Sequence, residues 1–524
     1  MIKHNMDSFF DTDNQTSSLH VYKLNADDFD SKLFHIQSSL GYIWLTSIIV
    51  TDRISSDGVF ELKYDFLNTE EYCKFSILLH IPMDKVVTSI SNMWMNASVF
   101  EQEIYENFGI KFNRKYRKKF YKQDENIFPL RKSTSVFPNI FSENINYDLN
   151  LCLNKSYSNN LINFGVFISN DLVENCDVVN GYYHIGIEKY FEGLSLSELI
   201  PSIESSFHVN GVQWSHLICL NVESANELTL TERAKALRMI VLELNRVYSH
   251  LLSILKLANN LEYNYLFDSV FLLIKRLKII NVSYSDNTKL YNLMTPGGIS
   301  KDASQVWLSR VIDEIDIIKK EFIIIFRNFK SNSLLIKNLK IGLNSKNFGT
   351  SWSVSGPLAR AMGINFDLRK LDPIYFYSDV DFEIPIGTSS SCYDLFTVKF
   401  EEIYQSINIL TQVLDNLPTG EILLENNFGV LNKHNRDLEE KRIIDSVKSF
   451  NKFGNINKTS YFEGSDGLMG LSLVKGHNRF NRVGMISPSC ANKVIFETLS
   501  IGKDASDLEL FWTALNISMH EVER

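Results

Sequence analysis

The chain has 524 residues, which favours roughly two to four domains, and its 44% hydrophobic and 22% charged residues are typical of a globular protein with buried cores. Its formal net charge of −9 argues against nucleic-acid binding as the main function. No apolar signal segment follows the first lysine, and the apolar runs fall short of the roughly 18 residues of a membrane span, so we expect a soluble chain able to dock on a membrane-embedded partner.

The first part of the chain alternates short apolar runs with turn residues. Between residues 31 and 100 the runs LGYIWLTSIIV, VFELKYDFLN and CKFSILLHIP predict strands of an antiparallel sheet with a helix or two. A helical stretch at 100–108 precedes the basic run KFNRKYRKKFYK at 111–122. Such a run is either a solvated loop or a docking segment for an acidic partner subunit.

A domain linker is predicted at residues 136–160, where Ser, Asn and Pro are frequent and no hydrophobic period is visible. Beyond it the clearest helix covers TLTERAKALRMIVLELNRVYSHLLSILKLANNL, with capping-box spacing at Thr229 and Glu232 and a stop signal at Asn259 and Asn260. Two more helices are predicted at 305–329 and 395–417. The apolar stripe of the first helix is Leu237, Ile240, Val241, Leu244, Val247, Leu251 and Ile254.

A polar stripe accompanies this apolar stripe. Glu243, Arg246 and His250 recur at helical spacing and share one face. Spacing alone favours a solvated face with salt bridges. On a helix buried from several sides the same residues must instead be paired internally, because unpaired buried charge is costly.

The six cysteines are scattered, and no two of them lie within five residues of each other. This spacing excludes a local Cys-x-x-Cys site for zinc, an iron–sulfur cluster or nickel. We interpret them as separate buried thiols, with a metal site assembled from distant cysteines as the alternative. They are Cys73, Cys152, Cys176, Cys219, Cys392 and Cys490.

The motifs GxGxxG, Walker A, HExxH and GxSxG are absent from the sequence. Residues 101–112, EQEIYENFGIKF, resemble instead the ERExYDxFGIxF motif of the 30-kilodalton subunit family of respiratory complex I. That family ends near a PLRK element, and residues 129–132 read PLRK here. The first 135 residues therefore resemble that subunit.

The remainder resembles the 49-kilodalton subunit family of complex I, which shares its fold with the large subunit of nickel–iron hydrogenases. GYYHIGIEK at 181–189 is similar to GYxHxGxEK, and residues 221–252 are similar to AVEK followed by RAxxIRxxxxELxRxxSHL. GPLARAMGINFDLRK at 356–370 resembles GxxLRxxGxxxDxRK, and residues 385–406 resemble PxGxxxDxxDRxxVRxxExxxS. The end of the chain, ALNISMHEVER, aligns with the family's terminal acidic-x-acidic-Arg segment.

The resemblance implies an α+β chain in two parts, a fusion of the two subunit types. We expect a small N-terminal α/β sandwich-type domain at 1–135, the linker at 136–160, and a helix-bundle-centred α+β domain of the hydrogenase large-subunit type at 161–524. The implied function is that of a peripheral subunit on the cytoplasmic side of the cell membrane. It would form a quinone-type acceptor chamber beside an iron–sulfur partner subunit and next to membrane-arm subunits, with NADH oxidation and the clusters held elsewhere. The chamber would appear as an incomplete cleft between the bundle and residues 181–189.

No nickel–iron site is expected in this chain. Hydrogenases of this fold hold the metals with two CxxC pairs, whose positions fall on Phe207 and Asn210 and on Ser518 and Glu521. None of these four residues supplies the soft thiolate that such a centre needs.

The resemblance also names candidate site residues. In complex I a His, a Tyr and an Asp approach the quinone; their positions fall on Asn160, His208 and Asn260. His208 can still donate a hydrogen bond and titrate near neutral pH. His184 and Glu188 are further candidates for proton transfer. The matched polar positions interpreted as buried ion pairs that fix the fold and the partner contact are Arg238, Glu243, Arg246, His250, Asp367, Arg369 and Lys370, with His184 and Glu188 among them.

Three functions stay open at this point. The first is a redox subunit that shapes the acceptor chamber and couples electron arrival to ion movement. The second is a degenerate, non-redox subunit that joins a soluble module to an antiporter-like membrane module. The third, an ordinary complex I subunit from a fast-evolving AT-rich genome, is weakened by the replaced loop around Asn160.

Overall fold

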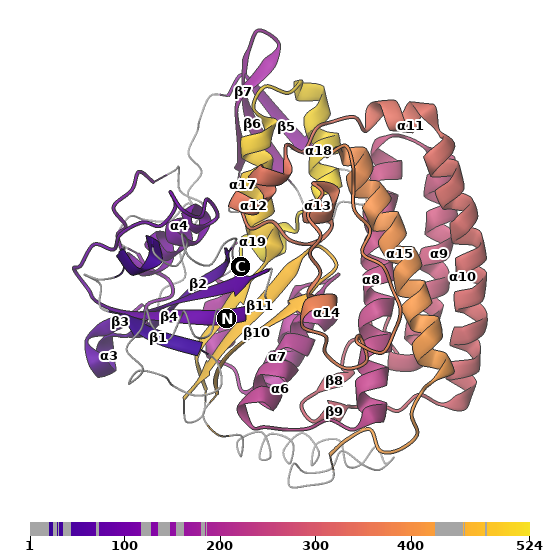
Figure 1. Cartoon of the computed structure of the whole chain (residues 1–524), viewed down its shortest axis with the longest axis horizontal. Coiled ribbons are helices and arrows are strands. Elements are labelled where there is room, and N and C mark those ends of the chain that lie inside the picture. Colours follow the sequence, from indigo (N-terminus) through magenta and orange to yellow (C-terminus); the bar gives the residue numbers. More distant parts are fainter. Residues whose placement is uncertain are drawn as a thin grey trace.

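The computed structural model shows a sheet-containing N-terminal domain beside a larger domain built on long helices (Figure 1). No helix in the described part of the chain is long and apolar enough to cross a membrane. The structure describes residues 20–24, 29, 31–34, 43–69, 73–116, 127–134, 147–153, 162–179, 184, 186–424, 454, 456–476 and 479–524.

The N-terminal domain is a four-stranded sheet covered by helix α4. The strand order is β1-β4-β3-β2, with β1 parallel to β4 and the other pairs antiparallel. Alternate residues of β3, from Phe60 to Phe66, are buried in a core that α4 helps to close, and Glu61 and Asp65 on its other face are buried as well. The three predicted strands are confirmed. The elements are β1 (His20–Leu24), β2 (Ile43–Arg53), α3 (Ile54–Asp57), β3 (Val59–Asn68), β4 (Cys73–Pro82) and α4 (Ala97–Phe108).

The second half of the predicted linker contains a strand. Residues Leu149–Leu153 form β5, which pairs antiparallel with β6 (Ile162–Ser169), and β6 pairs with β7 (Leu172–Val179). Leu149 and Leu151 pack against the main core, so alternate residues of this short segment anchor it. The apolar positions are too few for the strand to stand out among the polar residues around it.

The basic run at 111–122 is described only as far as residue 116. Within that part, Arg114 pairs with the buried carboxylate of Glu101 at 3.2 Å, so it belongs to the domain rather than to a solvated loop. The rest of the run lies outside the described residues.

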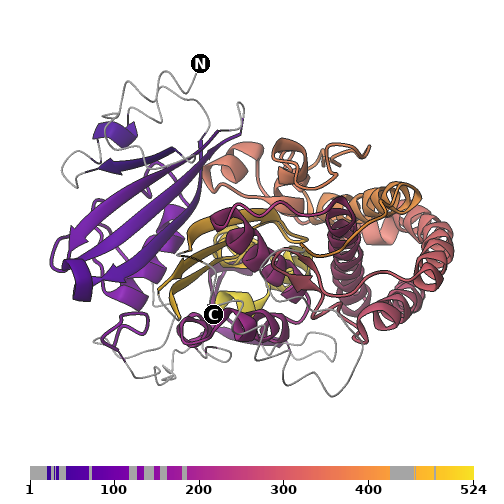
Figure 2. The ribbon, with the colours of Figure 1, turned by 90° about the horizontal axis from the view of Figure 1, so that it is seen from below.

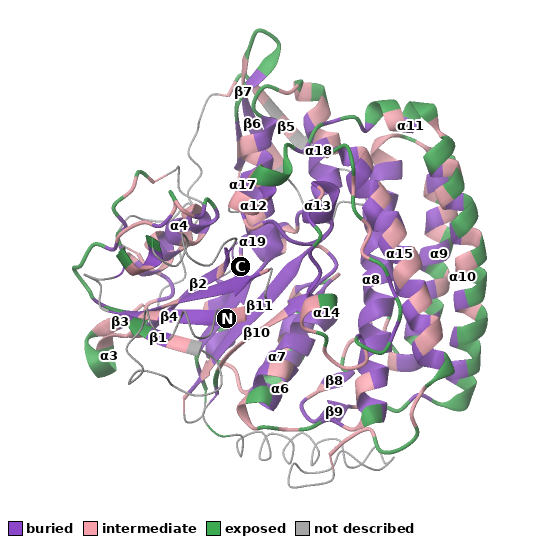
Figure 3. Ribbon diagram, in the orientation of Figure 1, coloured by how far each residue is buried: buried purple, intermediate pink, exposed green. Residues whose placement is uncertain are grey.

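Four long helices form a bundle in the C-terminal domain. Helix α8 packs against α9 and α15, and α10 closes the ring by packing against both of them. Figure 2 shows the four helices side by side, on the side of the molecule away from the N-terminal sheet. Figure 3 shows α8 buried along nearly its whole length, whereas α9 and α10 expose their outer faces. The bounds are α8 (Glu232–Asn260), α9 (Asn264–Ser285), α10 (Gln305–Ser331) and α15 (Cys392–Asp415).

Helix α8 begins two residues later than its predicted cap. Thr231, not Thr229, is the N-cap residue, and its hydroxyl accepts a hydrogen bond from the amide of Ala234. Glu232 therefore occupies the first helical position and pairs with Lys235 at 2.7 Å instead of closing a capping box. The helix ends at Asn260 as predicted, and its whole apolar stripe is buried.

Shorter elements fill the space between the bundle and the N-terminal domain. A three-stranded antiparallel sheet, β10-β11-β12, lies next to β2 and is covered by α7. The remaining elements are α5 (Ile187–Glu192), α6 (Leu196–Ser206), α7 (Gly211–Ala225), β8 (Met294–Thr295), β9 (Gly298–Ile299), α11 (Ser333–Asn338), α12 (Lys346–Ser351), α13 (Gly356–Ala361), α14 (Leu368–Leu371), β10 (Asn457–Glu463), β11 (Leu468–Lys475), β12 (Phe480–Ile486), α17 (Pro488–Ser500), η3 (Ala505–Asp507), α18 (Leu508–Leu515) and α19 (Met519–Val522).

The seam between the two domains is polar and directly bonded. Tyr461 on β10 donates a hydrogen bond of 2.8 Å to Asp65 on β3, and Lys63 donates one of 3.0 Å to Thr459. A cavity of about 210 Å³ lies at this seam, between β3, β4 and β10. The cleft expected between the bundle and residues 181–189 stays a prediction, since most of that motif's first half is outside the described residues.

A close backbone approach at Gly356 gives a test of the fold. Gly356 has φ +69°, and a methyl group there would lie 2.6 Å from the amide nitrogen of Gly467. We expect Gly356→Ala to lower the free energy of unfolding by about 3 kcal/mol, from the strained φ and the clash together. Gly342→Ala is the matched control, because nothing lies within 4 Å of a methyl group there. Equal denaturation midpoints for the two variants would contradict this packing.

Candidate functional site

Two segments far apart in the sequence meet at the candidate site. Asn210 immediately precedes α7, and Glu521 lies in α19. The Nδ2 atom of Asn210 donates a hydrogen bond to Oε1 of Glu521 at 3.2 Å. Phe207, three residues before Asn210, is buried, and Ser518, three residues before Glu521, is the N-cap residue of α19. The four positions assigned to the cysteine pairs thus lie on two segments in direct contact.

Neutral groups surround the Glu521 carboxyl. It accepts hydrogen bonds from the Ser487 and Ser489 hydroxyls at 2.5 and 2.9 Å, from the Trp214 indole at 3.4 Å, and from Asn210. Burial raises the pKa of Glu521 above its ordinary value, although the serine and asparagine donors oppose this shift. The site therefore favours the protonated carboxyl more than water does.

His208 and His520 form an imidazole pair beside this contact. Their ring centroids lie 5.9 Å apart in an edge-on arrangement, and His208 is exposed to solvent. Partial burial and the nearby Lys289 lower the pKa of His208; burial and His208 lower that of His520. Both rings favour the neutral form, which donates from one nitrogen and accepts at the other.

Of the other two quinone-position candidates, Asn260 lies in the part of the chain that the structure describes. Asn260 ends α8 and donates a hydrogen bond to the Thr513 hydroxyl on α18. Asn160 lies outside the described residues. The described structure therefore joins His208 to His520, and Asn260 to Thr513.

His184 and Glu188 contact the last two residues of the chain. A ring nitrogen of the buried His184, Nδ1, lies 3.1 Å from the carbonyl oxygen of Glu523, and burial lowers the pKa of His184. Glu188 pairs with Arg482 at 2.8 Å and with Arg524 at 3.1 Å. Burial alone would raise the pKa of Glu188, but the two arginines outweigh it and lower the value. This geometry favours a fixed carboxylate over a proton donor at Glu188.

Arg238 ties three elements together without contact to water. Its guanidinium binds both carboxylate oxygens of Glu223 on α7, at 2.6 and 3.0 Å. It also donates to the carbonyl oxygens of Gly298 and Thr295 at 2.9 and 2.7 Å, which fixes the β8–β9 turn against α8. It donates to the Tyr375 hydroxyl as well, at 2.9 Å, and the fork geometry of arginine is what allows one side chain to bond all five acceptor atoms.

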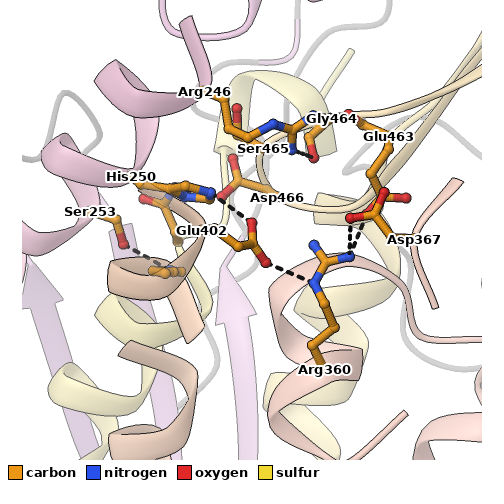
Figure 4. A network of polar contacts seen from close by, with 12 residues as sticks. Arg246, His250, Ser253, Arg360, Asp367, Glu402, Glu463, Gly464, Ser465 and Asp466 are labelled. Carbon is orange, nitrogen blue, oxygen red and sulfur yellow. Dashed lines mark hydrogen bonds and ion pairs between the residues drawn. The ribbon is translucent and has the colours of Figure 1, made fainter. Parts of the chain in front are cut away.

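A second buried network holds the polar stripe of α8 (Figure 4). The solvated-face interpretation of this stripe is wrong, because α13, α14, α15 and β10 all send charged side chains toward it. Glu243 pairs with Arg246 at 3.4 Å and with Arg369 at 3.2 Å, and His250 lies 2.9 Å from Glu402. Its members, none more than 4% exposed, are Glu243, Arg246, His250, Arg360, Asp367, Arg369, Glu402 and Glu463.

Arg360 is the centre of this network and was missed by the sequence analysis. It pairs with Glu402 at 2.7 Å, with Glu463 at 3.0 Å and with Asp367 at 3.3 Å. Arg360 and Glu402 stand inside two of the family motifs, at GPLARAM and VKFEE, and were passed over there; Glu463 stands in none.

The prediction of a buried ion pair is wrong for Lys370. Its side chain is exposed, and its ammonium group lies 3.9 Å from the centroid of the Phe382 ring. The neighbouring Arg369 is buried and pairs with Asp367 at 2.8 Å. Successive residues of a short helix point in different directions, so only one of the two basic residues can reach the network.

Asp466 connects the Asn210–Glu521 contact with the bundle. It accepts hydrogen bonds from Asn210 at 3.4 Å and from Asn516 at 2.8 Å. The buried ammonium of Lys399 donates to the Ser253 hydroxyl and the Ala514 carbonyl, both at 2.8 Å. Burial lowers the pKa of Lys399 to about 8, although Asp466 favours the charged form. Neither residue was singled out from the sequence.

No group of three or more His, Cys, Asp or Glu side chains in the described ranges is arranged to hold a metal ion. The side chains at the four former cysteine positions do not fit a nickel–iron centre, because Asn210 and Glu521 are bonded to each other and offer no thiolate. Burial raises the pKa of Cys176, Cys392 and Cys490 to about 12, so these three are inert thiols.

Comparisons with known proteins match two parts of the chain to subunits of the same respiratory enzyme. Residues 284–524 match the family described as respiratory-chain NADH dehydrogenase, 49 Kd subunit, and residues 23–138 match the 30 Kd subunit. The D subunit of the NADH-quinone oxidoreductase of Ehrlichia canis (strain Jake) is 29% identical over 370 residues, 68% of this chain and 92% of the relative.

Two further relatives carry the double letter C/D in their names. The NADH-quinone oxidoreductase C/D subunit of Bdellovibrio bacteriovorus is 24% identical over 440 residues, 78% of this chain and 77% of the relative. That of Phocaeicola vulgatus is 26% identical over 367 residues, 63% of this chain and 70% of the relative.

The Arg238 contacts predict a large difference between two Arg→Lys changes. We expect Arg238→Lys to lower the free energy of unfolding by roughly 3 kcal/mol, because one ammonium cannot replace the fork between Glu223 and two carbonyls. Arg276→Lys is the control: Arg276 is partly exposed and pairs with Glu314 and Glu321, so its loss should cost below about 1 kcal/mol. Urea denaturation of the full chain measures both, and equal costs would contradict the buried role of Arg238.

Proposed function

Because the chain belongs to the respiratory-chain NADH dehydrogenase family and joins its 30 Kd and 49 Kd domains in one polypeptide, we propose that it is a peripheral-arm subunit of a complex I-like NADH-quinone oxidoreductase. In this role it forms part of the chamber in which a quinone-type acceptor is reduced. Electrons come from an iron–sulfur cluster held by a partner subunit, and NADH is oxidised elsewhere in the assembly. The chain docks on membrane-arm subunits at the cytoplasmic side of the membrane.

The observation that carries the proposal is the meeting of α7 and α19 at Asn210 and Glu521. This contact occupies the place that the family resemblance assigns to a metal cradle, and it presents the His208–His520 pair beside it. The exposure of His208 leaves one side of the pair open for an acceptor and for the partner subunit that completes the chamber.

The residues at this place suit the reduction of a quinone. Conversion to the quinol takes two electrons and two protons, so the chamber must supply protons to two oxygen atoms. Neutral His208 donates a hydrogen bond to one oxygen and polarises it as negative charge develops there. His208 can take up a proton from solvent on its exposed side and pass it to the acceptor, and His520 lies beside it with the ring centroids 5.9 Å apart.

Glu521 and Asp466 set the electrostatics behind the imidazole pair. Burial raises the pKa of the Glu521 carboxyl against its neutral hydrogen-bond donors, so its negative charge, which would oppose reduction of the acceptor, is less favoured here than in water. Asp466 accepts a hydrogen bond from Asn210, which also bonds Glu521, and so connects this site with the helix bundle. In this proposal, Arg238 and the Arg360 network hold the helices that carry these residues, and the coupling to ion movement runs through that framework.

A second function, a non-redox subunit that joins a soluble module to a membrane module, is favoured by one observation. Glu188 is a fixed carboxylate, and Asn260 stands at the position where the complex I resemblance implies an acidic partner for His208. Activity of His208 variants separates the two functions.

We expect His208→Phe to lower acceptor reduction by the assembled complex roughly 100-fold, because a positioned proton donor is removed. His208 is exposed, so the variant should assemble normally. His80→Phe is the matched control on the exposed side of β4 and should leave turnover unchanged. Measurement of quinone reduction by complexes purified with each variant decides the question. Wild-type turnover with His208→Phe would reject the redox role and support the structural one.

A further inference from the structure

The network around Arg360 contains more buried acid than buried base. Every member touches another member directly, and none is more than 4% exposed. Burial lowers the pKa of His250, so its imidazole adds no charge near neutral pH. The guanidinium groups are those of Arg246, Arg360 and Arg369, and the carboxyl groups are those of Glu243, Asp367, Glu402 and Glu463.

Three positive charges therefore face four carboxyl groups. An uncompensated carboxylate this far from water is costly, so this excess of acid favours a proton on one of the four carboxyl groups. The contacts of each carboxyl group show which one it is.

Three of the four carboxyl groups, those of Glu243, Asp367 and Glu402, each accept at least two hydrogen bonds from side-chain donors. Glu243 accepts from Arg246, from Arg369 and from the Tyr377 hydroxyl at 2.6 Å. Asp367 accepts two hydrogen bonds from the Arg369 side chain, at 2.8 and 3.1 Å, and a third from its amide.

Glu402 accepts from Arg360 Nε at 2.7 Å and from His250 at 2.9 Å. Glu402 has a pKa lowered to about 2; burial opposes this shift and Arg360 outweighs the burial. These contacts hold Glu402 ionised.

Glu463 is the exception. Its cationic contact is Arg360 Nη1 at 3.0 Å, and the same nitrogen also donates to Asp367 and to the Phe366 carbonyl. Its other oxygen accepts a long hydrogen bond of 3.3 Å from the amide of Leu368. Figure 4 shows the carboxyl groups of Glu463 and Asp367 converging on one side of the Arg360 guanidinium.

We propose that Glu463 is a buried proton-binding site: the network holds one proton on this carboxyl group at neutral pH, beside the ionised Asp367. Two carboxyl groups that share one cationic nitrogen do not both ionise easily, since each raises the cost of charging the other. Burial and the Asp367 carboxylate raise the pKa of Glu463. For Asp367, burial acts in the same direction, but Arg369 and Arg360 outweigh it and hold the pKa of Asp367 well below its usual range.

The charged and titratable groups that face Glu463 come from four elements. Those that act on Glu463 directly are Asp367, Arg360, Arg246 and Arg369; the other members of the network, Glu243 and His250 from α8 and Glu402 from α15, are bonded to these or to one another. Lys399 lies three residues before Glu402 on α15; its ammonium group is hydrogen-bonded to Ser253 and Ala514 and interacts electrostatically with Asp466 and Glu402.

The proton site has a direct structural link to the candidate chamber. Arg246 holds the carbonyl oxygens of both Glu463 and Gly464, at 2.5 and 2.8 Å, at the start of the turn between β10 and β11. Two residues later the turn presents Asp466 to Asn210. Loss of the Glu463 proton adds one negative charge at the base of this turn. Its consequence for acceptor reduction rests on the proposed function; the proton itself does not.

Glu463→Gln tests the proposal in the purified full chain. Glutamine has the shape of a protonated glutamate, so if Glu463 is neutral in the folded chain the variant should unfold at or above the wild-type temperature at neutral pH, because only the unfolded wild-type chain gains free energy by ionising Glu463. Glu402→Gln and Asp367→Asn are the matched controls. Both remove an ionised carboxylate from a buried arginine and should lower the unfolding temperature by several degrees. A loss at Glu463→Gln as large as the loss in the controls would overturn the proposal.

The pH dependence gives a second readout. The folded-state pKa of Glu463 lies above that of the unfolded chain, so its contribution to stability is lost as the pH rises through the folded value. The unfolding temperature of Glu463→Gln should therefore exceed that of the wild type by an amount that grows toward alkaline pH. A constant difference across the pH range would contradict a titrating Glu463.

Infrared spectroscopy detects a protonated carboxyl group directly and does not depend on a difference in stability between variants. The wild-type chain should show the carbonyl band of a protonated carboxyl group that is missing from Glu463→Gln and retained in Glu321→Gln, whose carboxylate pairs with Arg276 outside the network. Identical carboxyl bands in wild type and Glu463→Gln would overturn the proposal. Since neither measurement uses an acceptor, failure here is distinct from failure of the redox function.

Discussion

The C-terminal domain depends on a guanidinium group that has no access to water. Arg360 is fully buried, and its charge is tolerated only because carboxyl groups from α15, β10 and the residue before α14 surround it. Removing one partner from such a pair costs several times more than removing a surface ion pair. Elements from four parts of the chain must therefore assemble in one relative position, which is a requirement for a chamber whose residues lie on separate elements.

The last residues of the chain connect this framework to the other parts of the molecule. Glu521 meets Asn210 at the candidate chamber, the Glu523 carbonyl meets His184, and Arg524 bonds both Glu188 and Glu103. Glu103 belongs to the EQEIYENFGIKF helix of the N-terminal domain, so one short segment contacts the chamber, the GYYHIGIEK region and the first domain together. The proposed function places the open side of His208 toward a partner, while this segment holds the closed side.

The sequence predicted those helices and strands whose apolar residues recur at a regular helical or strand spacing. The strands of the N-terminal sheet and the apolar stripe of α8 were found because alternate or every third and fourth residue is apolar, whatever packs against them. The environment of Glu243 and His250 was undecided, since their burial depends on charges brought by distant elements. Glu463 was missed because nothing in its strand marks it as the neighbour of Arg360. Lys370 was misplaced beside Arg369 because a motif match fixes identity and not direction.

The most direct test of the acceptor chamber is the composition of the complex that holds this chain. A tagged chain purified from membranes would be examined by mass spectrometry for its partners and by metal and quinone analysis. The proposed function predicts an iron–sulfur subunit and membrane-arm subunits, with iron and bound quinone but no nickel. Membrane partners without iron or quinone would contradict it and leave a structural coupling subunit.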